Sequence, residues 1–121
     1  MGLDFKGSDV SFSYGGFHRF RRRVASSAGI MLDKMEGYTG TNPIPWSTVN
    51  DDLKYLLDHS DCDGQISAIC CGKIAKRLEE IIVTWNFPVS DIEANWHLEN
   101  ARTLVKDMKA LAKKNKPLIF W

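Results

Sequence analysis

The sequence predicts a mainly α-helical α+β fold, with about four helices and a small antiparallel sheet formed by the N- and C-terminal strands. Apolar residues recur at spacings of three and four along four segments, which is the period of a helix with one buried face. Short apolar and aromatic runs without that period lie near both ends of the chain. A chain of 121 residues with 44% apolar content is the size of one globular domain, so we expect a single domain over 1–121.

The N-terminal residues predict two short strands joined by a turn. Leu3 to Phe5 and Val10 to Tyr14 are apolar or aromatic, and the polar residues between them are typical of a turn. Leu118 to Trp121 form another apolar run after a proline. Because so apolar a segment is seldom left in water, we expect it to pair with the N-terminal strands.

The first helix is predicted from about Gly16 to Met35, where Gly37 and a loop rich in glycine, threonine and proline end it. The second is predicted from about Val49 to Asp58, with Ser47 or Thr48 as its cap. The apolar stripe of the first helix comprises Phe17, Phe20, Val24, Ala28, Met31 and Met35. That of the second comprises Val49, Leu53, Leu56 and Leu57.

The third helix is predicted to begin after Ser67, a natural cap, and to end before Asn86-Phe87-Pro88. Its apolar stripe comprises Cys71, Ile74, Leu78, Ile81 and Trp85. The fourth helix is predicted to begin at Ser90, with Glu93 completing a capping box, and to run to about Lys114.

Composition excludes several classes of partner. The formal net charge of +1 provides no field for a long nucleic acid. No apolar run approaches the roughly 20 residues that span a bilayer, and the N-terminus lacks the features of a signal peptide, so we expect no membrane partner. Three cysteines, two of them adjacent, fit a reducing cytosol better than a disulfide framework. The sequence does not set the oligomeric state.

An acidic stretch between the second and third helices resembles an EF-hand calcium loop from His59 to Cys70. Asp61 and Asp63 fall at two ligand positions, Gly64 falls at the family's glycine, and Ser67 falls at a further oxygen position. The resemblance implies that Asp61, Asp63 and Ser67 are metal ligands in a weak calcium site. We expect no other cofactor.

Two departures weaken this metal site. The first ligand position holds His59 and the last holds Cys70, where the family supplies oxygen ligands. The alternative interpretation is a polar turn in which Asp61 or Asp63 caps the third helix. Zinc is disfavoured because Cys70 and its neighbour Cys71 point about 100° apart on a helix.

A basic segment at the start of the first helix is the main candidate site. Two glycines follow a strand, and four arginines lie within the next seven residues. Exposed N–H groups at a helix start attract anions, glycine allows close approach, and guanidinium groups suit phosphate or carboxylate. On the helical wheel three arginines lie opposite the apolar stripe, and Arg21 lies at its border. The candidate ligand-binding residues are Tyr14, Gly15, Gly16, His18, Arg19, Arg22 and Arg23.

The alternative for this basic face is a solvated, salt-bridged surface, because the chain has ample carboxylates to neutralise it. The anion site therefore depends on arginines that point outward and lack an internal counter-ion, and it would be lost if the protein's own acids neutralised them with no cavity alongside. The Gly-Gly pair is followed by neither Gly-Lys-Ser/Thr nor G-x-G-x-x-G, so it is not a nucleotide-binding loop of those types.

Enzyme signals are weak. The three histidines are spread along the chain, and there is no H-E-x-x-H pair or G-x-S-x-G turn. We therefore expect a non-enzymatic binding protein whose partner is a small anionic ligand or an acidic protein surface. A degenerate EF-hand-like metal-binding module is the first alternative, and a small metal-dependent hydrolase is the second.

Four segments carry a family resemblance: Met1-Gly2-Leu3-Asp4-Phe5, Ser13-Tyr14-Gly15-Gly16-Phe17-x-x-Phe20-Arg21, Leu57-x-His59-Ser60-Asp61-Cys62-Asp63-Gly64 and Pro117-Leu118-Ile119-Phe120. With these segments the chain resembles a group of small bacteriophage and prophage proteins. The resemblance implies a cytoplasmic location in an infected or lysogenic bacterium. It also implies an accessory or anti-defence role, in which the protein binds a host protein or sequesters a small molecule such as a nucleotide signal. No catalytic or binding residue carries over from this group.

Overall fold

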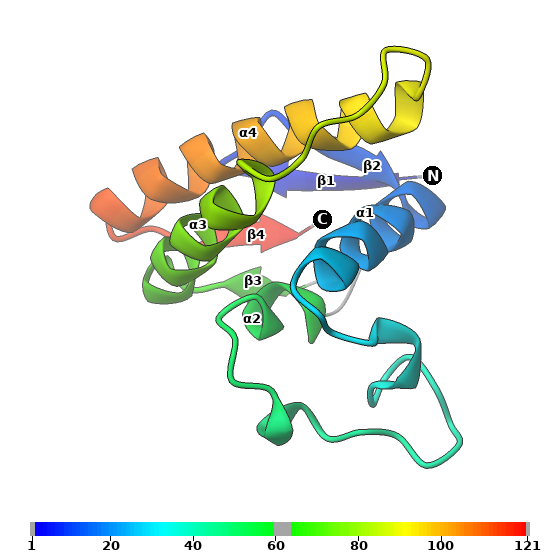
Figure 1. Cartoon of the computed structure of the whole chain (residues 1–121). Helices are drawn as coiled ribbons and strands as arrows, with labels where there is room; N and C mark the ends of the chain where they lie inside the picture. Colours follow the sequence, from blue (N-terminus) through cyan, green and yellow to red (C-terminus); the bar gives the residue numbers. More distant parts are fainter. Residues whose placement is uncertain (1, 60–63, 121) are drawn as a thin grey trace.

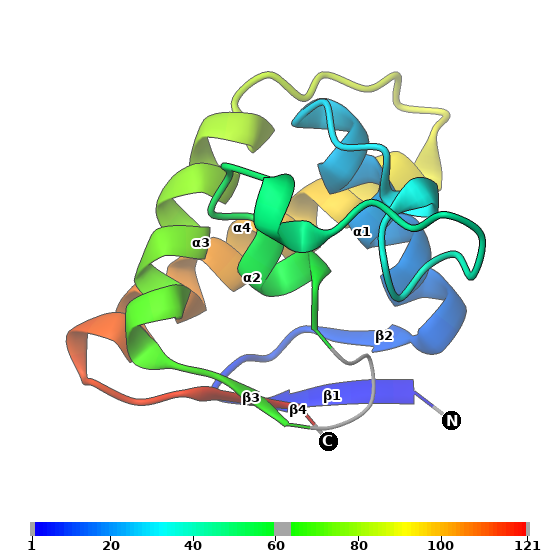
Figure 2. The ribbon, with the colours of Figure 1, turned by 90° about the horizontal axis from the view of Figure 1, so that it is seen from below.

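The computed structural model describes residues 2–59 and 64–120. Within these residues a four-stranded antiparallel sheet forms one layer, and the helices cover one of its faces (Figures 1 and 2). The strands are β1 (Gly2–Lys6), β2 (Ser11–Ser13), β3 (Gln65–Ile66) and β4 (Leu118–Phe120), in the order β2-β1-β4-β3. The predicted mainly helical α+β fold with a small antiparallel sheet is confirmed.

The sheet buries alternate residues, as a strand with one covered face must. In β1, Leu3 and Phe5 are buried, whereas Asp4 and Lys6 between them are exposed. The expected pairing of the two ends is present, because Phe5 of β1 lies opposite Phe120 of β4. The strand β3 was not predicted. It is two residues long and lies inside the acidic stretch, where Ile66 pairs with Leu118.

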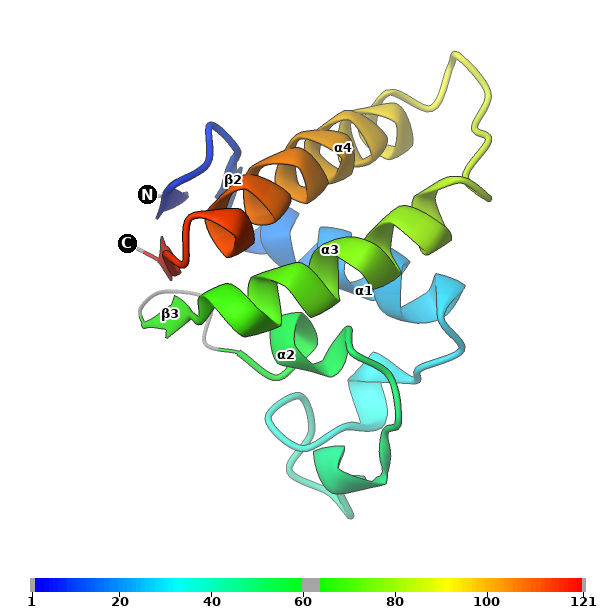
Figure 3. The ribbon, with the colours of Figure 1, turned by 90° about the vertical axis from the view of Figure 1, so that its left-hand side faces the viewer.

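The helices of the described chain are α1 (Tyr14–Ser27), α2 (Lys54–Leu57), α3 (Ala68–Ile82) and α4 (Ile92–Lys113). Helices α3 and α4 lie side by side (Figure 3). They approach closely at Gly72, where an added Cβ would lie 3.4 Å from the Cβ of Ala112. No helix in the described part of the chain is both long and apolar enough to cross a membrane.

Helix α1 ends at Ser27, so the prediction that it continues to Met35 is wrong. Gly29 adopts φ +76°, and the N–H of Ile30 donates to the carbonyl of Ala25 at 2.9 Å. This is a Schellman motif, which closes a helix with a left-handed residue just after its end. Met35 is still buried, because a short 3-10 turn (Leu32–Lys34) carries the chain back against the core.

Helix α2 is a single turn, so its predicted start near Val49 is also wrong. Ser47 and Thr48 lie in a 3-10 turn (Trp46–Thr48). The Thr48 hydroxyl donates to the carbonyl of Pro45 at 2.7 Å and caps no helix. Three of the four predicted inward positions, Leu53, Leu56 and Leu57, are nevertheless fully buried, and Val49 is half-buried.

The predicted N-terminal cap is correct for α3 and wrong by one residue for α4. Ser67 caps α3 as expected, because its hydroxyl accepts the N–H of Cys70 at 3.2 Å. In α4 the cap is Asp91, whose carboxylate accepts the N–H of Ala94 at 3.1 Å, and the prediction of Ser90 is wrong by one residue. Helix α3 ends at Ile82, slightly before Trp85.

Replacing Asp91 with alanine is expected to lower the free energy of unfolding by about 1 kcal/mol, because the Ala94 N–H loses its acceptor. Ser90→Ala is the matched control, and we expect it to change stability by under about 0.5 kcal/mol. Urea unfolding followed by circular dichroism measures both. A larger effect at Ser90 would show that it is the cap in solution.

Candidate functional site

Gly16 at the start of α1 takes part in a helix cap. The hydroxyl of Ser13 accepts the N–H of Gly16 at 2.9 Å, so this N–H already has a partner. A Cβ at Gly16 would lie 2.9 Å from that hydroxyl, which explains the glycine without a ligand. Gly15 and Tyr14 are exposed beside the cap. The backbone at this helix start is therefore a less open anion site than the sequence indicates.

Two of the predicted arginines have internal counter-ions. The Nε of Arg19 lies 3.1 Å from both carboxylate oxygens of Glu93. A terminal nitrogen of Arg22 lies 2.7 Å from the carboxylate of Asp33. The expectation that the arginine face lacks internal counter-ions is thus wrong at both residues. All four side chains are about half exposed, so each pair contributes little to stability, roughly 0–1 kcal/mol.

Arg23 is held by a histidine and an aromatic ring. Its Nε donates to Nδ1 of His97 at 3.0 Å. Its guanidinium lies over the ring of Phe87, 5.0 Å from the ring centroid, which is a cation–π contact. Arg23 therefore projects from α1 toward the segment that joins α3 to α4.

These three arginines line one cavity of about 480 Å³, which we call the arginine cavity. The residues from α1 recur at helical spacing and share one face. Two aromatic rings from the α3–α4 connection complete the cavity, with centroids 5.6 Å apart. The indole N–H of Trp85 donates to the hydroxyl of Ser27 at 2.8 Å. The lining residues are Arg19, Arg22, Arg23, Ser26, Ser27, Trp85, Phe87 and Glu93.

The predicted binding residues therefore lie at three different places in the structure. Arg19, Arg22 and Arg23 meet in the arginine cavity, whereas Tyr14 stays at the helix start. His18 stacks on the ring of Tyr38, with centroids 5.9 Å apart. It lines a different cavity of about 560 Å³ with Arg21, Glu36, Tyr38 and Asp58 among others.

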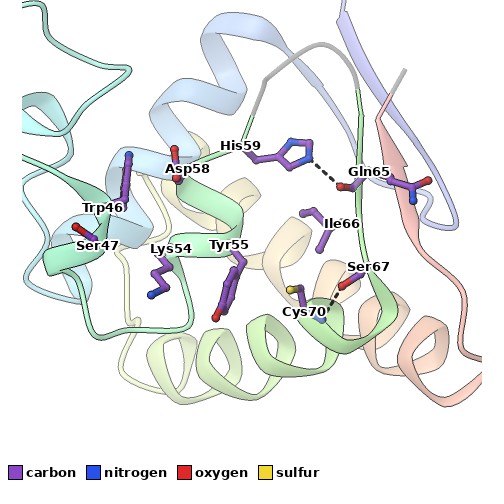
Figure 4. Close-up of a pocket in the computed structure, with 10 residues that line it drawn as sticks. All are labelled: Trp46, Ser47, Lys54, Tyr55, Asp58, His59, Gln65, Ile66, Ser67 and Cys70. Carbon is purple, nitrogen blue, oxygen red and sulfur yellow. Dashed lines mark hydrogen bonds between the residues drawn. The ribbon is translucent and has the colours of Figure 1, made fainter.

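Another cavity, of about 540 Å³, lies between α2, β3 and the start of α3 (Figure 4). The Nε2 of His59 lies 3.1 Å from the carbonyl of Gln65 on its rim. Burial and the nearby charge of Glu36 raise the pKa of Asp58, while His59 opposes that shift. The lining mixes one lysine, one carboxylate, one histidine and other polar and apolar groups, so it favours no particular class of ion. It comprises Trp46, Ser47, Lys54, Tyr55, Asp58, His59, Gln65, Ile66, Ser67 and Cys70.

The predicted calcium ligands Asp61 and Asp63 lie outside the described residues. The third, Ser67, uses its hydroxyl to cap α3. In residues 2–59 and 64–120, no group of three or more histidine, cysteine, aspartate or glutamate side chains is placed to hold a metal ion. The calcium hypothesis stays a prediction.

Sequence reasoning missed the residues that close the arginine cavity. Trp85 was assigned to an apolar stripe, and Phe87 was treated only as part of a helix stop. Ser26 and Ser27 share the face of the arginines at helical spacing, so that spacing was an available signal. No local signal places Trp85 and Phe87 beside α1, because they lie about sixty residues further along the chain.

No protein-family model, curated protein or solved structure matches this chain. The resemblance to small bacteriophage proteins therefore stays a hypothesis.

Proposed function

We propose that this protein is a non-enzymatic binding protein that holds a small phosphate-bearing ligand with an aromatic group, such as a nucleotide, in the arginine cavity. One observation carries this proposal. Three guanidinium groups from one face of α1 line the same cavity as the rings of Trp85 and Phe87. Guanidinium groups bind phosphate through paired N–H donors, and aromatic side chains stack on bases at about 1–3 kcal/mol each.

The ion pairs already present are compatible with such a ligand. Glu93 and Asp33 are surface carboxylates, and exposed pairs of this kind are worth roughly 0–1 kcal/mol. A phosphate carries more charge than one carboxylate and accepts several hydrogen bonds, so it would replace these partners at Arg19 and Arg22 with a net gain. The volume of about 480 Å³ lies within the ordinary range for small-molecule sites.

The lining of the cavity supports binding over the hydrolase alternative. The side chains that line it are guanidinium, hydroxyl and aromatic groups with one paired carboxylate. None of these described groups forms the nucleophile–base pair that a hydrolase needs. Sequestration of a nucleotide in a bacterial host, as the phage resemblance implies, is consistent with this chemistry.

The test is the double variant Arg19→Ala with Arg22→Ala. We expect its affinity for ribonucleoside 5′-monophosphates to fall by about tenfold or more, because two charge-assisted hydrogen-bonding groups are lost. Its melting temperature should change by only about 2 °C, since both removed ion pairs are exposed. Isothermal titration calorimetry and thermal unfolding measure the two quantities. Inorganic phosphate and the free nucleosides are the comparison probes.

The matched control is Arg102→Ala with Lys106→Ala, which removes two exposed charges from α4 away from the cavity. This control should bind like the native protein. Equal weakening in both double variants would show a non-specific charge effect and remove the cavity as the site. Failure of the native protein to bind any of the probes would overturn the proposed function. Unfolding of the Arg19/Arg22 variant would show that those arginines are structural.

A further inference from the structure

His97 is a fully buried histidine on α4 that contacts the arginine cavity through Arg23. Its Nδ1 accepts a hydrogen bond of 3.0 Å from the Nε of Arg23. Its Nε2 is buried and has no hydrogen-bond partner among the described residues. The rings of Phe20 and Trp96 lie near it, with centroids 5.6 and 5.9 Å away.

The hydrogen bond fixes the protonation state of the imidazole. The guanidinium of Arg23 has only donors, so Nδ1 must present its lone pair and the single ring proton must lie on Nε2. A proton on Nδ1 would point at the Nε–H of Arg23, and the hydrogen bond would break. His97 therefore holds Arg23 only while the imidazole is neutral.

The surroundings keep the imidazole neutral. Burial is the main cause that lowers the pKa of His97, and the positive charge of Arg23 lowers it further. Arg19, also on α1, acts in the same direction. Glu93 and Asp91 at the start of α4 act in the opposite direction but do not reverse the shift. The two neighbouring rings, Phe20 and Trp96, carry no charge.

We infer that His97 is the positioning residue of the arginine cavity: its neutral imidazole occupies the Nε of Arg23, so that the terminal nitrogens are the donors left for the phosphate, and its protonation releases the guanidinium. This inference rests on the proposed function, because it concerns the same cavity. It makes anion binding weaker in acid. A histidine that contacted the phosphate itself would have the opposite effect, because protonation would add positive charge at the site.

The binding test compares the native protein with His97→Asn, whose amide oxygen replaces the Nδ1 acceptor and does not titrate. Affinity for adenosine 5′-monophosphate is measured by calorimetry from about pH 5 to about pH 8. Toward acid, protonation of the phosphate, whose second pKa is near 6, weakens binding equally in both proteins. We expect the native protein to lose about tenfold more affinity than His97→Asn toward acid. Equal slopes would overturn the pH-dependent part of the inference.

A third variant, His97→Leu, removes the acceptor and should bind about tenfold more weakly than His97→Asn at every pH. If His97→Leu binds as well as the native protein at neutral pH, His97 does not position Arg23. Should His97→Leu fail to fold, the comparison of the native protein with His97→Asn still decides the outcome.

Nuclear magnetic resonance provides a readout that needs no ligand. The imidazole nitrogens of native His97 should show an unprotonated Nδ1 and a protonated Nε2. The Nε–H of Arg23 should exchange slowly with water in the native protein and rapidly in His97→Leu. The reverse tautomer, or identical exchange in both proteins, would overturn the inference. If these spectra are as expected but no nucleotide binds, the proposed function fails and the link between His97 and Arg23 stands.

Discussion

Replacing Arg21 with methionine is expected to destabilise the protein by about 3 kcal/mol, more than the loss of any other arginine on α1. Arg21 is only 4% exposed. Its Nη1 donates to the carbonyl of His59 at 2.7 Å, with the carbonyls of Leu56 and Leu57 at 3.3 and 3.4 Å. Its guanidinium also lies 4.4 Å from the ring centroid of Phe17. Methionine preserves the apolar stem but leaves buried carbonyls at the end of α2 without this donor.

The matched control is Arg22→Met, one residue further along the same helix. Arg22 is half exposed and pairs with an exposed carboxylate, so its loss should change stability by under about 0.5 kcal/mol. Urea unfolding of both variants measures the difference. Equal free energies of unfolding would mean that the buried guanidinium does not join α1 to α2 in solution.

The contrast between these two arginines shows what helical periodicity predicts and what it omits. The 3.6-residue period correctly placed Arg22 on the exposed face and Arg21 at the border of the apolar stripe. It says nothing about which groups lie opposite that border. The acceptors of Arg21 come from residues 35 to 38 positions away, at the end of α2. Arg21 can therefore be buried because distant carbonyl groups accept its hydrogen bonds, and no local sequence pattern reveals those groups.

Apart from β3, the order of helices and strands was predicted from the sequence, because each of these elements depends on local signals. The apolar stripes, the Ser67 cap and the apolar ends of the chain identify the helices and the sheet. Helix ends were predicted less well. At α1 the apolar spacing continues through Met35, but Gly29 closes the helix earlier through its left-handed backbone. The spacing of apolar residues alone does not take this helix-ending glycine into account.

The candidate site was predicted only in part, because local spacing reveals a helix face but not the distant residues that lie against it. Arg19, Arg22 and Arg23 share a helix face, and that much follows from their spacing. Phe87 and His97, which determine how Arg23 is held, lie 64 and 74 residues further along the chain. The sequence also did not identify which carboxylates pair with the arginines. The chain has 15 acidic residues, and the fold brings Glu93 and Asp33 to Arg19 and Arg22.

The second large effect is expected at Phe120, where alanine should lower the free energy of unfolding by about 4 kcal/mol. Strand β4 lies between β1 and β3, so it joins the N-terminal hairpin to the segment that leads into α3. Phe120 is 2% exposed, and its ring centroid lies 4.9 Å from that of Phe5 and 4.1 Å from that of His59. Truncation leaves a cavity among rigid rings that cannot close without moving the sheet.

The neighbouring residue Ile119 is the control, because it points to the other side of β4 and is half-buried. Ile119→Ala should lower stability by only about 1 kcal/mol, since less apolar surface is lost and no enclosed cavity forms. Guanidinium unfolding of both variants, monitored by tryptophan fluorescence, measures the difference. If Ile119→Ala were the more destabilising change, the register of β4 would have to be shifted by one residue, because such a shift exchanges the buried and exposed faces of a strand. A loss at Phe120 alone supports the observed register and the role of β4 in holding the sheet together.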